Sequence, residues 1–345
     1  MQAPDLRDIA RRAEKWFARH RRPLPWRERY EPYHVWLSEV MLQQTRMEVV
    51  LPYFERFLAR FPTIASLAAA SDHDVTAAWS GLGYYRRARM LRDGAVAVME
   101  RFGGELPSTV EELLTIPGIG RYTAGAIASV AFERRAPIAD GNVTRVVARL
   151  FGSDGETWER AAALVEACRS PRDFNQALME LGALVCTPRN PSCLICPLRE
   201  PCVARATNRV AELPAPKPKK ATRELHIPLF LIVDAYGRVL MRREEGPLMH
   251  AMYHLPHGDA SLLDASPLDV TRRALLGTIR HTVTTRKIEF ALYDAEPRGS
   301  VDGYEWIDPE ALATVPHPSY VAKALRLAAV AGSRLPVTEG SSLSR

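Results

Sequence analysis

Four cysteines lie within seventeen residues of this chain, in the segment CTPRNPSCLICPLREPC. Their spacing is Cys186-x6-Cys193-x2-Cys196-x5-Cys202, which lets four thiolates surround one metal centre. Four thiolates hold either tetrahedral zinc or a [4Fe–4S] cluster. Zinc sites usually contain two CxxC pairs and this segment has one, so the spacing favours the cluster over zinc, with unligated cysteines as a third alternative. The fifth cysteine, Cys168, lies in an apolar helical stretch and is predicted to be a buried hydrophobic residue.

The chain is too long for one comfortable hydrophobic core, since it has 345 residues, and its composition changes at residues 212–224. That segment, ELPAPKPKKATRE, has no apolar periodicity and predicts an extended linker between two domains. Residues 1–211 contain 29 Lys and Arg against 24 Asp and Glu, and the linker contains four against two. The basic excess therefore predicts that an anionic polymer binds the first domain and the linker.

The sequence contains no apolar run long enough to cross a membrane, and its first residues lack the apolar core of a signal peptide. Hydrophobic residues make up 47% of the chain and charged residues 25%, which is ordinary for a globular protein. Clustered cysteines indicate a reducing compartment rather than a disulfide framework. We therefore expect a cytoplasmic protein with no membrane contact and no targeting segment.

Apolar residues recur at helical spacing in the first domain and at strand spacing in the second. Residues 6–17 carry one apolar face, and residues 35–45 are apolar on nearly every side, as in a buried helix. Ser108 and Glu111 predict a capping box. The second domain is predicted to contain a hairpin of 227–234 and 238–241, strands at 286–293 and 304–307, and a helix at 318–330. The predicted fold class is a mainly α region followed by an α+β domain.

A glycine turn interrupts two predicted helices in the segment LLTIPGIGRYTAG, residues 113–125. Gly118 and Gly120 allow the backbone to approach another molecule closely, and free N–H groups at a helix start bind anions. Such contacts hold a nucleic-acid backbone without reading its sequence. The alternative is a turn that serves helix packing alone.

Two carboxylates lie in contrasting sequence surroundings. Glu39 lies inside the apolar segment VWLSEVMLQQT, so it must be paired or must keep its proton through a raised pKa; the alternative is a structural hydrogen bond. Asp140 precedes Gly141 and a predicted helix start, which should keep this carboxylate ionised; the alternative is a simple N-cap. One protonated acid and one anionic carboxylate are the pair that glycosidic chemistry requires.

Five segments occur in a distinctive order: LPWRERYEPYHVWLSEVMLQQTRMEVV (24–50), GLGYYRRAR (81–89), IPGIGRYTAGAI (116–127), ADGNVTRV (139–146) and the four-cysteine segment. Together they resemble the adenine DNA glycosylases of the MutY type, within the helix-hairpin-helix glycosylase superfamily. The resemblance implies a catalytic region over 1–211, with a six-helix barrel at about 26–133 and an iron–sulfur domain from about 1–25 and 134–211. It places a [4Fe–4S] cluster on the four cysteines. A Nudix-like domain at 225–333 and a tail at 334–345 follow the linker.

The resemblance also implies roles for individual residues. Glu39 matches the acid that protonates the adenine base, and Asp140 matches the carboxylate that stabilises the sugar cation. Tyr122 and Asn142 match residues that hold these two in place. The remaining matches are Trp26, Arg27 and Glu180 in the adenine pocket, Gln44 and Tyr84 beside the unpaired partner base, and Gly118 and Gly120 on the DNA backbone.

Tyr122 stands where the related endonuclease III lineage carries a lysine that cleaves the strand through a Schiff base. Tyrosine cannot form an imine, so the chain is expected to be a monofunctional glycosylase with little or no lyase activity. In the second domain, Thr284 aligns with the hydroxyl residue of the family's 8-oxoguanine loop. Val283 and Thr285 depart from the phenylalanine and histidine that flank it, which weakens the expected discrimination of 8-oxoguanine from guanine.

The implied function is base-excision repair: removal of adenine opposite 8-oxoguanine, and also opposite guanine, in double-stranded DNA. The expected protein is a monomer associated with the nucleoid. Two alternatives are a thymine or uracil mismatch glycosylase of the same superfamily and an iron–sulfur DNA-binding protein without activity. The second domain and Glu180 argue against the first, and the presence of both Glu39 and Asp140 argues against the second.

Overall fold

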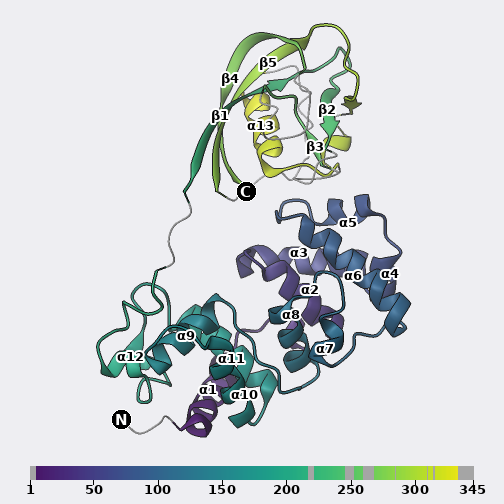
Figure 1. Ribbon diagram of the computed structural model, residues 1–345. Helices are drawn as coiled ribbons and strands as arrows, with labels where there is room; N and C mark the ends of the chain where they lie inside the picture. Colours follow the sequence, from purple (N-terminus) through teal and green to yellow (C-terminus); the bar gives the residue numbers. More distant parts are fainter. Residues whose placement is uncertain are drawn as a thin grey trace. The chain divides into compact units, whose positions relative to one another are not determined.

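The structure is a computed structural model that describes residues 5–216, 221–244, 252–258, 268–283, 285–308, 310–313 and 315–332. The chain divides into two compact units, Met1–Ala70 with Met90–Pro218, and Ser71–Arg89 with Lys219–Arg345. The predicted fold class is confirmed: the N-terminal region is helical and an α+β region follows it (Figure 1).

The described part of the first unit is built from helices and loops. Its α-helices are α1 (Leu6–His20), α2 (Pro32–Leu42), α3 (Met47–Arg60), α4 (Ile64–Ala68), α7 (Val110–Leu113), α8 (Arg121–Ala126), α9 (Gly141–Phe151), α10 (Thr157–Ala167), α11 (Pro171–Leu184) and α12 (Val203–Ala206). Helix α6 (Arg86–Phe102) begins in the second unit and continues in the first, and α5 (Asp72–Ala78) belongs to the second. Short 3-10 turns occupy Pro25–Arg27 and Cys193–Ile195, and a π-helical turn occupies Ile127–Ala131.

Helices α1 and α2 are both held in the first unit by buried apolar side chains. The face predicted for residues 6–17 packs in α1 against α10 and α11, and it shares one apolar core with α9, so the N-terminal helix lies with helices more than a hundred residues away (Figure 1). Cys168 joins this core and is buried, as predicted. Helix α2 is buried on all sides from Val35 to Met41, and Pro32 begins it because its fixed φ suits the first helical turn.

The predicted capping box was displaced by one residue. Thr109, not Ser108, is the N-cap of α7, because its hydroxyl accepts from the Glu112 N–H at 3.3 Å and donates to the Glu112 carboxylate at 2.6 Å. Ser108 instead accepts a hydrogen bond from Arg134 at 2.9 Å. In a Ser-Thr pair either residue can serve as the N-cap of the helix. Here Ser108 is engaged by Arg134, and Thr109 caps α7.

From Lys219 onward, the described residues of the second unit form two small sheets and a helix that covers one of them. Its strands are β1 (Arg223–Leu231), β2 (Val239–Arg243), β3 (Tyr253–His254), β4 (Val270–Val283), β5 (Arg286–Pro297) and β6 (Glu305–Ile307). One sheet has the order β1-β5-β4, with β1 parallel and β4 antiparallel to β5, and the other has the order β3-β2-β6. A 3-10 turn at Ala311–Ala313 precedes α13 (Ser319–Val330), which lies alongside the first sheet (Figure 1).

The buried face of α13 packs on the apolar side chains of β1, β4 and β5. Gly277 marks the closest approach, since a Cβ there would lie 2.9 Å from Leu327. The predicted hairpin is present but short: Asp234 accepts from the N–H groups of Tyr236 and Arg238 at its tip, both at 2.9 Å, Val233 pairs with Val239, and the Leu240 N–H donates to the Ile232 carbonyl at 3.0 Å. Beyond the tip, β1 and β2 separate into different sheets, a long-range arrangement that the alternating pattern does not contain.

The strands predicted at 286–293 and 304–307 and the helix at 318–330 appear as β5, β6 and α13. Strand β4 was not predicted, although it is the longest strand described. Within the described residues, no helix combines the length and apolar character needed to span a bilayer.

Candidate active site

A cavity of about 950 Å³ opens in the first unit between α2, α8, α9 and α11. Nine of the predicted site residues belong to its lining: Trp26, Arg27, Glu39, Gln44, Gly120, Tyr122, Asp140, Asn142 and Glu180. These residues come from five separate stretches of sequence, and the fold collects them around one cavity. Trp26 is buried and packs edge-on against Phe54, with ring centroids 5.1 Å apart, which fixes the indole in the lining.

Glu39 projects from the buried helix α2 and is 8% exposed. Tyr122 of α8 donates a hydrogen bond from Oη to Glu39 Oε2 at 2.7 Å. Burial raises the pKa of Glu39 to about 7; the Tyr122 hydrogen bond opposes the rise, and the nearby charge of Asp140 adds to it. The carboxyl group can therefore carry a proton near neutral pH and give it up within the same pH range.

Asp140 is the N-cap of α9. Its Oδ1 accepts from the Val143 N–H at 2.7 Å, and its Oδ2 accepts from Asn142 Nδ2 at 3.0 Å. Burial raises the pKa of Asp140, and the bonds from Val143 and Asn142 oppose that rise. Desolvation in the cavity lining therefore raises both pKa values, and the predicted pair of one protonated acid and one ionised carboxylate stays a prediction.

Tyr122 is held at two points. Besides Glu39, its hydroxyl contacts the Sδ atom of Met179 in α11 at 3.2 Å. Burial raises the pKa of this phenol well above its ordinary value, so Tyr122 remains a hydrogen-bond donor at neutral pH. The phenol therefore favours the ionised form of Glu39 while burial favours the protonated form.

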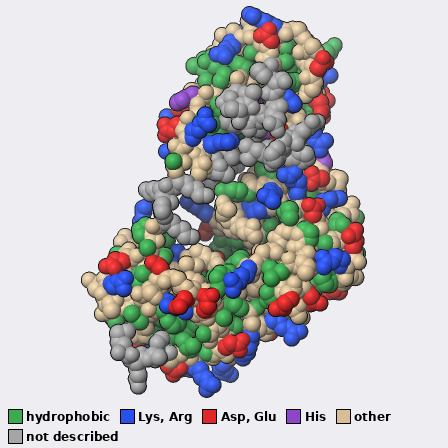
Figure 2. Space-filling view, in the orientation of Figure 1, with side chains coloured by type: hydrophobic (Ala, Val, Ile, Leu, Met, Phe, Trp, Pro, Cys, Tyr) green, Lys and Arg blue, Asp and Glu red, His purple; other side chains and the backbone are tan. Residues whose placement is uncertain are grey.

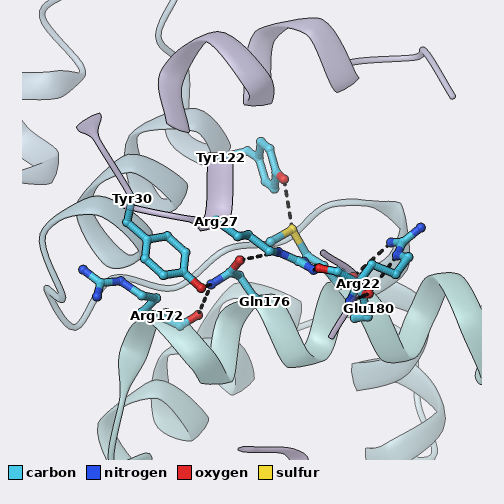
Figure 3. Close-up of polar contacts among 8 residues, drawn as sticks. Arg22, Arg27, Tyr30, Tyr122, Arg172, Gln176 and Glu180 are labelled. Carbon is cyan, nitrogen blue, oxygen red and sulfur yellow. Dashed lines mark hydrogen bonds and ion pairs between the residues drawn. The ribbon is translucent and has the colours of Figure 1, made fainter. Parts of the chain in front are cut away.

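At the other end of the cavity, two arginines converge on Glu180, which is 1% exposed (Figure 3). Arg22 donates from Nε to Oε1 at 2.7 Å and from Nη2 to Oε2 at 2.9 Å, and Arg27 donates from Nη2 to Oε2 at 3.0 Å. Burial alone would raise the pKa of Glu180, but the two guanidinium groups overcome it, so the net pKa lies below the ordinary value. Glu180 is an anion in this pocket.

Arg22 and Gln176 were not predicted as site residues. Gln176 accepts from Arg27 Nε at 2.8 Å and so orients the guanidinium group from α11 (Figure 3). Arg22 lies in a short basic stretch that resembles a solvated surface segment, and Gln176 lies on a helix with ordinary periodicity. No local sequence pattern identifies either residue as part of the site, because each interacts there with a residue about 150 positions away in the sequence.

The glycine turn joins α7 to α8. Gly118 has a φ of 81°, and a Cβ there would lie 2.9 Å from Met90 Cβ, so the turn conformation and close packing both require glycine. Gly120 is the N-cap of α8 and lines the cavity, and a Cβ there would meet nothing within 4 Å. Packing therefore accounts for Gly118, whereas Gly120 is left open toward the cavity.

Tyr84 does not belong to this cavity lining. It belongs to the second unit, is 50% exposed, and has a positive φ of 51°. The Arg87 guanidinium lies 5.6 Å from its ring centroid, within cation–π range. Thr284 lies outside the described residues, so its predicted role stays a prediction.

The four-cysteine segment follows α11 and folds back on α9. All four cysteines line one small cavity, together with Arg149. Burial raises the pKa of the Cys196 thiol to about 11 and also raises that of Cys202. Thiolates at these positions therefore need a compensating positive centre. Among the residues that the structure describes, no three Cys, His, Asp or Glu side chains already surround a single ion position.

Basic and acidic side chains are interspersed on the face of the molecule drawn in Figure 2. The predicted basic excess therefore does not gather into one patch on that face. Positive charge does lie at the cavity itself, because Arg22, Arg27 and Arg121 belong to its lining.

Residues 37–170 match the family described as HhH-GPD superfamily base excision DNA repair protein. An adenine DNA glycosylase of Rattus norvegicus is 45% identical over 226 residues, which are 60% of this chain and 43% of that protein. One of Homo sapiens is 47% identical over 208 residues, 55% of this chain and 38% of that protein. The solved structure of a thermostable thymine-DNA glycosylase has a TM-score of 0.54 and 28% identity, covering 59% of this chain and 97% of that one. The matches thus span about two fifths of the two curated relatives.

Proposed function

We propose that this chain, whose residues 37–170 belong to the HhH-GPD superfamily of base excision DNA repair proteins, is an adenine DNA glycosylase. The observation that carries the proposal is the pair of carboxylates in one cavity wall. Glu39 has a pKa of about 7 and a hydrogen bond from Tyr122, and Asp140 is held by donors from α9. The similarity to adenine DNA glycosylases supports adenine as the base that is removed.

The proposed reaction breaks the bond between N9 of adenine and C1′ of the sugar. An adenine inside a duplex is inaccessible, so the nucleotide must first rotate into the cavity, at a cost of about a few kcal/mol that is lower for a mispaired base. Glu39 then gives its proton to the base, which makes the base a better leaving group. Asp140 provides negative charge beside the cationic sugar, and water completes the hydrolysis.

The base end of the cavity fits a purine that carries an amino group. Glu180 is an anionic acceptor held by Arg22 and Arg27, and Trp26 provides an apolar wall beside them. An amino group can donate to this carboxylate, whereas a carbonyl oxygen at the same place would set one hydrogen-bond acceptor against another. This arrangement supports adenine over thymine or uracil as the substrate.

We further propose double-stranded DNA with an 8-oxoguanine:adenine or guanine:adenine mispair as the partner. The DNA-repair similarity of residues 37–170 and the open Gly120 at the start of α8 support DNA. Reading of 8-oxoguanine is assigned to a Nudix-like second domain through Thr284 and its neighbours, on sequence resemblance. The absence of lysine at Tyr122 supports monofunctional cleavage without strand scission.

The four cysteines are proposed to hold a [4Fe–4S] cluster. The donor set fits, because four cysteines line one cavity, and burial raises the pKa of the Cys196 and Cys202 thiols, so a positive centre would favour their ionisation. When bound, such a cluster ties the cysteine loop together and can exchange one electron. The proposed base removal uses only Glu39, Asp140 and water.

The deciding experiment measures base release in single turnover from four duplexes. They carry adenine opposite 8-oxoguanine, adenine opposite guanine, thymine opposite guanine and uracil opposite guanine. We expect release from the two adenine duplexes only, with strand breaks appearing only after alkali. Release of thymine or uracil without adenine would assign the alternative enzyme, and tight binding with no release would assign a DNA-binding protein without activity.

A further inference from the structure

Arg149 lies in α9 beside the four-cysteine segment and is only 3% exposed. Each nitrogen of its guanidinium group has an acceptor. Nε donates to the Leu213 carbonyl at 2.8 Å, Nη1 to the Thr187 carbonyl at 2.8 Å, and Nη2 to the Pro188 carbonyl at 3.3 Å. Nη1 also lies 3.3 Å from Cys186 Sγ. The buried guanidinium of Arg149 therefore connects α9 to the start of the four-cysteine segment and to Leu213, which follows that segment.

The charge of Arg149 has no carboxylate partner in the described part of the chain. Carbonyl groups satisfy its N–H donors but do not neutralise the charge, and burying an uncompensated ion is costly. The groups that can supply negative charge here are the cysteine sulfurs. Arg149 lines their cavity, and its own carbonyl oxygen lies 3.4 Å from Cys202 Sγ.

We propose that Arg149 is a positioning residue for the metal centre: its guanidinium holds Cys186 in place by donating to Sγ and partly neutralises the thiolate-bound centre. The inference rests on the proposed cluster. Hydrogen bonds and positive charge near cluster sulfurs stabilise the reduced, more negative state, which raises the reduction potential. Arg149 therefore has two separable effects, one on retention of the metal and one on the potential.

The experiment uses the full-length protein as purified and compares Arg149→Gln and Arg149→Lys with wild type. Two quantities are measured: the rate at which a ferrous chelator removes iron, and the midpoint potential of the cluster. For Arg149→Gln we expect iron loss at least tenfold faster. We also expect a negative shift of about 59 mV or more, a tenfold change for one electron.

Arg149→Lys separates the two effects because it keeps the charge and loses the planar group of donors. Its potential should stay near that of wild type, while iron loss should be faster than in wild type. Arg189→Gln is the matched control, because Arg189 is an exposed arginine of the same segment, between Cys186 and Cys193. It should leave both quantities unchanged. If Arg149→Gln does not fold, the iron-loss rate of Arg149→Lys alone decides the question.

Wild-type rates and potentials in both Arg149 variants would overturn the proposal, as would equal effects from Arg189→Gln. A wild-type protein that purifies with neither iron nor zinc would also overturn it. If the centre is zinc, the rate of zinc release tests the same contact, and unchanged release in both Arg149 variants would contradict it. Base release by the same preparations is measured separately, so a failure of the proposed glycosylase activity is recognised independently.

Discussion

Glu39 and Asp140 are both carboxylates in one cavity wall, yet their partners differ. A single phenol, Tyr122, donates to Glu39, whereas Asp140 receives a backbone N–H at a helix start and the amide of Asn142. More donors favour the charged form more strongly. Glu39 is therefore the more easily protonated of the two. We accordingly assign Glu39 as the acid and Asp140 as the anion in the proposed mechanism.

Glu39→Gln tests the acid directly. The amide keeps the shape of the side chain but has no proton to give at neutral pH, so adenine release should fall at least 10²–10⁴-fold, roughly the usual contribution of a general acid. In wild type the rate should decline as pH rises through about 7, because the proton leaves Glu39 over that range. Single-turnover rates across pH 5.5 to 8.5 provide the measurement, with binding to the mispaired duplex as the control. A rate within threefold of wild type would exclude Glu39 as the acid.

Tyr122→Lys tests the monofunctional assignment. The new amine would replace a phenol that contacts Glu39 at 2.7 Å, which places it beside the reacting sugar in the proposed mechanism. An amine can form an imine with the sugar carbon, so strand cleavage and borohydride trapping should appear in the variant. Tyr122→Phe is the control, since it lacks both the hydroxyl and an amine. Equal trapping by wild type and the lysine variant would contradict the assignment.

At the scale of elements, α9 and α11 meet at a contact that leaves no space for a methyl group. Gly182 of α11 faces Asn142 of α9, and a Cβ on Gly182 would lie 2.5 Å from Asn142 Cβ and 2.9 Å from its Cα. Because the obstructing atoms include backbone, the helices must shift to accept a side chain. The position of Asn142, and through it the hydrogen bond to Asp140, depends on this close packing.

Gly182→Ala should therefore affect both stability and activity. Overpacking of this kind costs about 1–3 kcal/mol, and displacement of Asn142 should slow adenine release even where the protein is folded. Thermal unfolding and single-turnover rates at a temperature well below the midpoint separate the two effects. Gly141→Ala is the stability control, because a Cβ there meets nothing within 4 Å. Unchanged unfolding in Gly182→Ala would show that the helices adjust without cost.

At the scale of the whole molecule, the two units respond to pH through different groups. In the second unit His254 is buried, and its Nδ1 lies 2.6 Å from Tyr320 Oη. Burial, with a smaller contribution from the neighbouring His257 and His317, lowers the pKa of His254 to about 3. The neutral ring is thus part of the core beneath α13.

This depressed pKa predicts acid sensitivity of the second unit. The unfolded chain takes up a proton on this histidine near pH 6.5, whereas the folded chain does so only near pH 3. The stabilising effect is therefore complete above pH 6.5 and is lost as pH falls toward 3, by about 2 kcal/mol at pH 5. Calorimetric unfolding between pH 7.5 and pH 5 measures it.

His254→Gln should flatten this pH dependence, since its amide oxygen can still accept from Tyr320 and does not titrate. His226→Gln is the control, because His226 lies on β1 with 77% of its side chain exposed. An unchanged pH dependence in His254→Gln would show that another group is responsible.

The sequence by itself determined the features that depend on local pattern. Helical periodicity located α1 and α2, strand propensity located β5 and β6, and the spacing of the cysteines brought four of them to one cavity. Nine residues identified by family resemblance line a common cavity, although their chemical roles stay predictions. These features are readable because they depend on neighbours within a few residues or on motifs of fixed spacing.

Only the tertiary structure decided the environments of those residues. Arg22 and Glu180 are 158 positions apart in sequence, so no local pattern indicates their ion pair. The same holds for the separation of β1 and β2 into two sheets and for the contact between Arg149 and Cys186. Desolvation likewise depends on what covers a group, and for that reason the position of Asp140 at a helix start does not by itself indicate that burial raises its pKa.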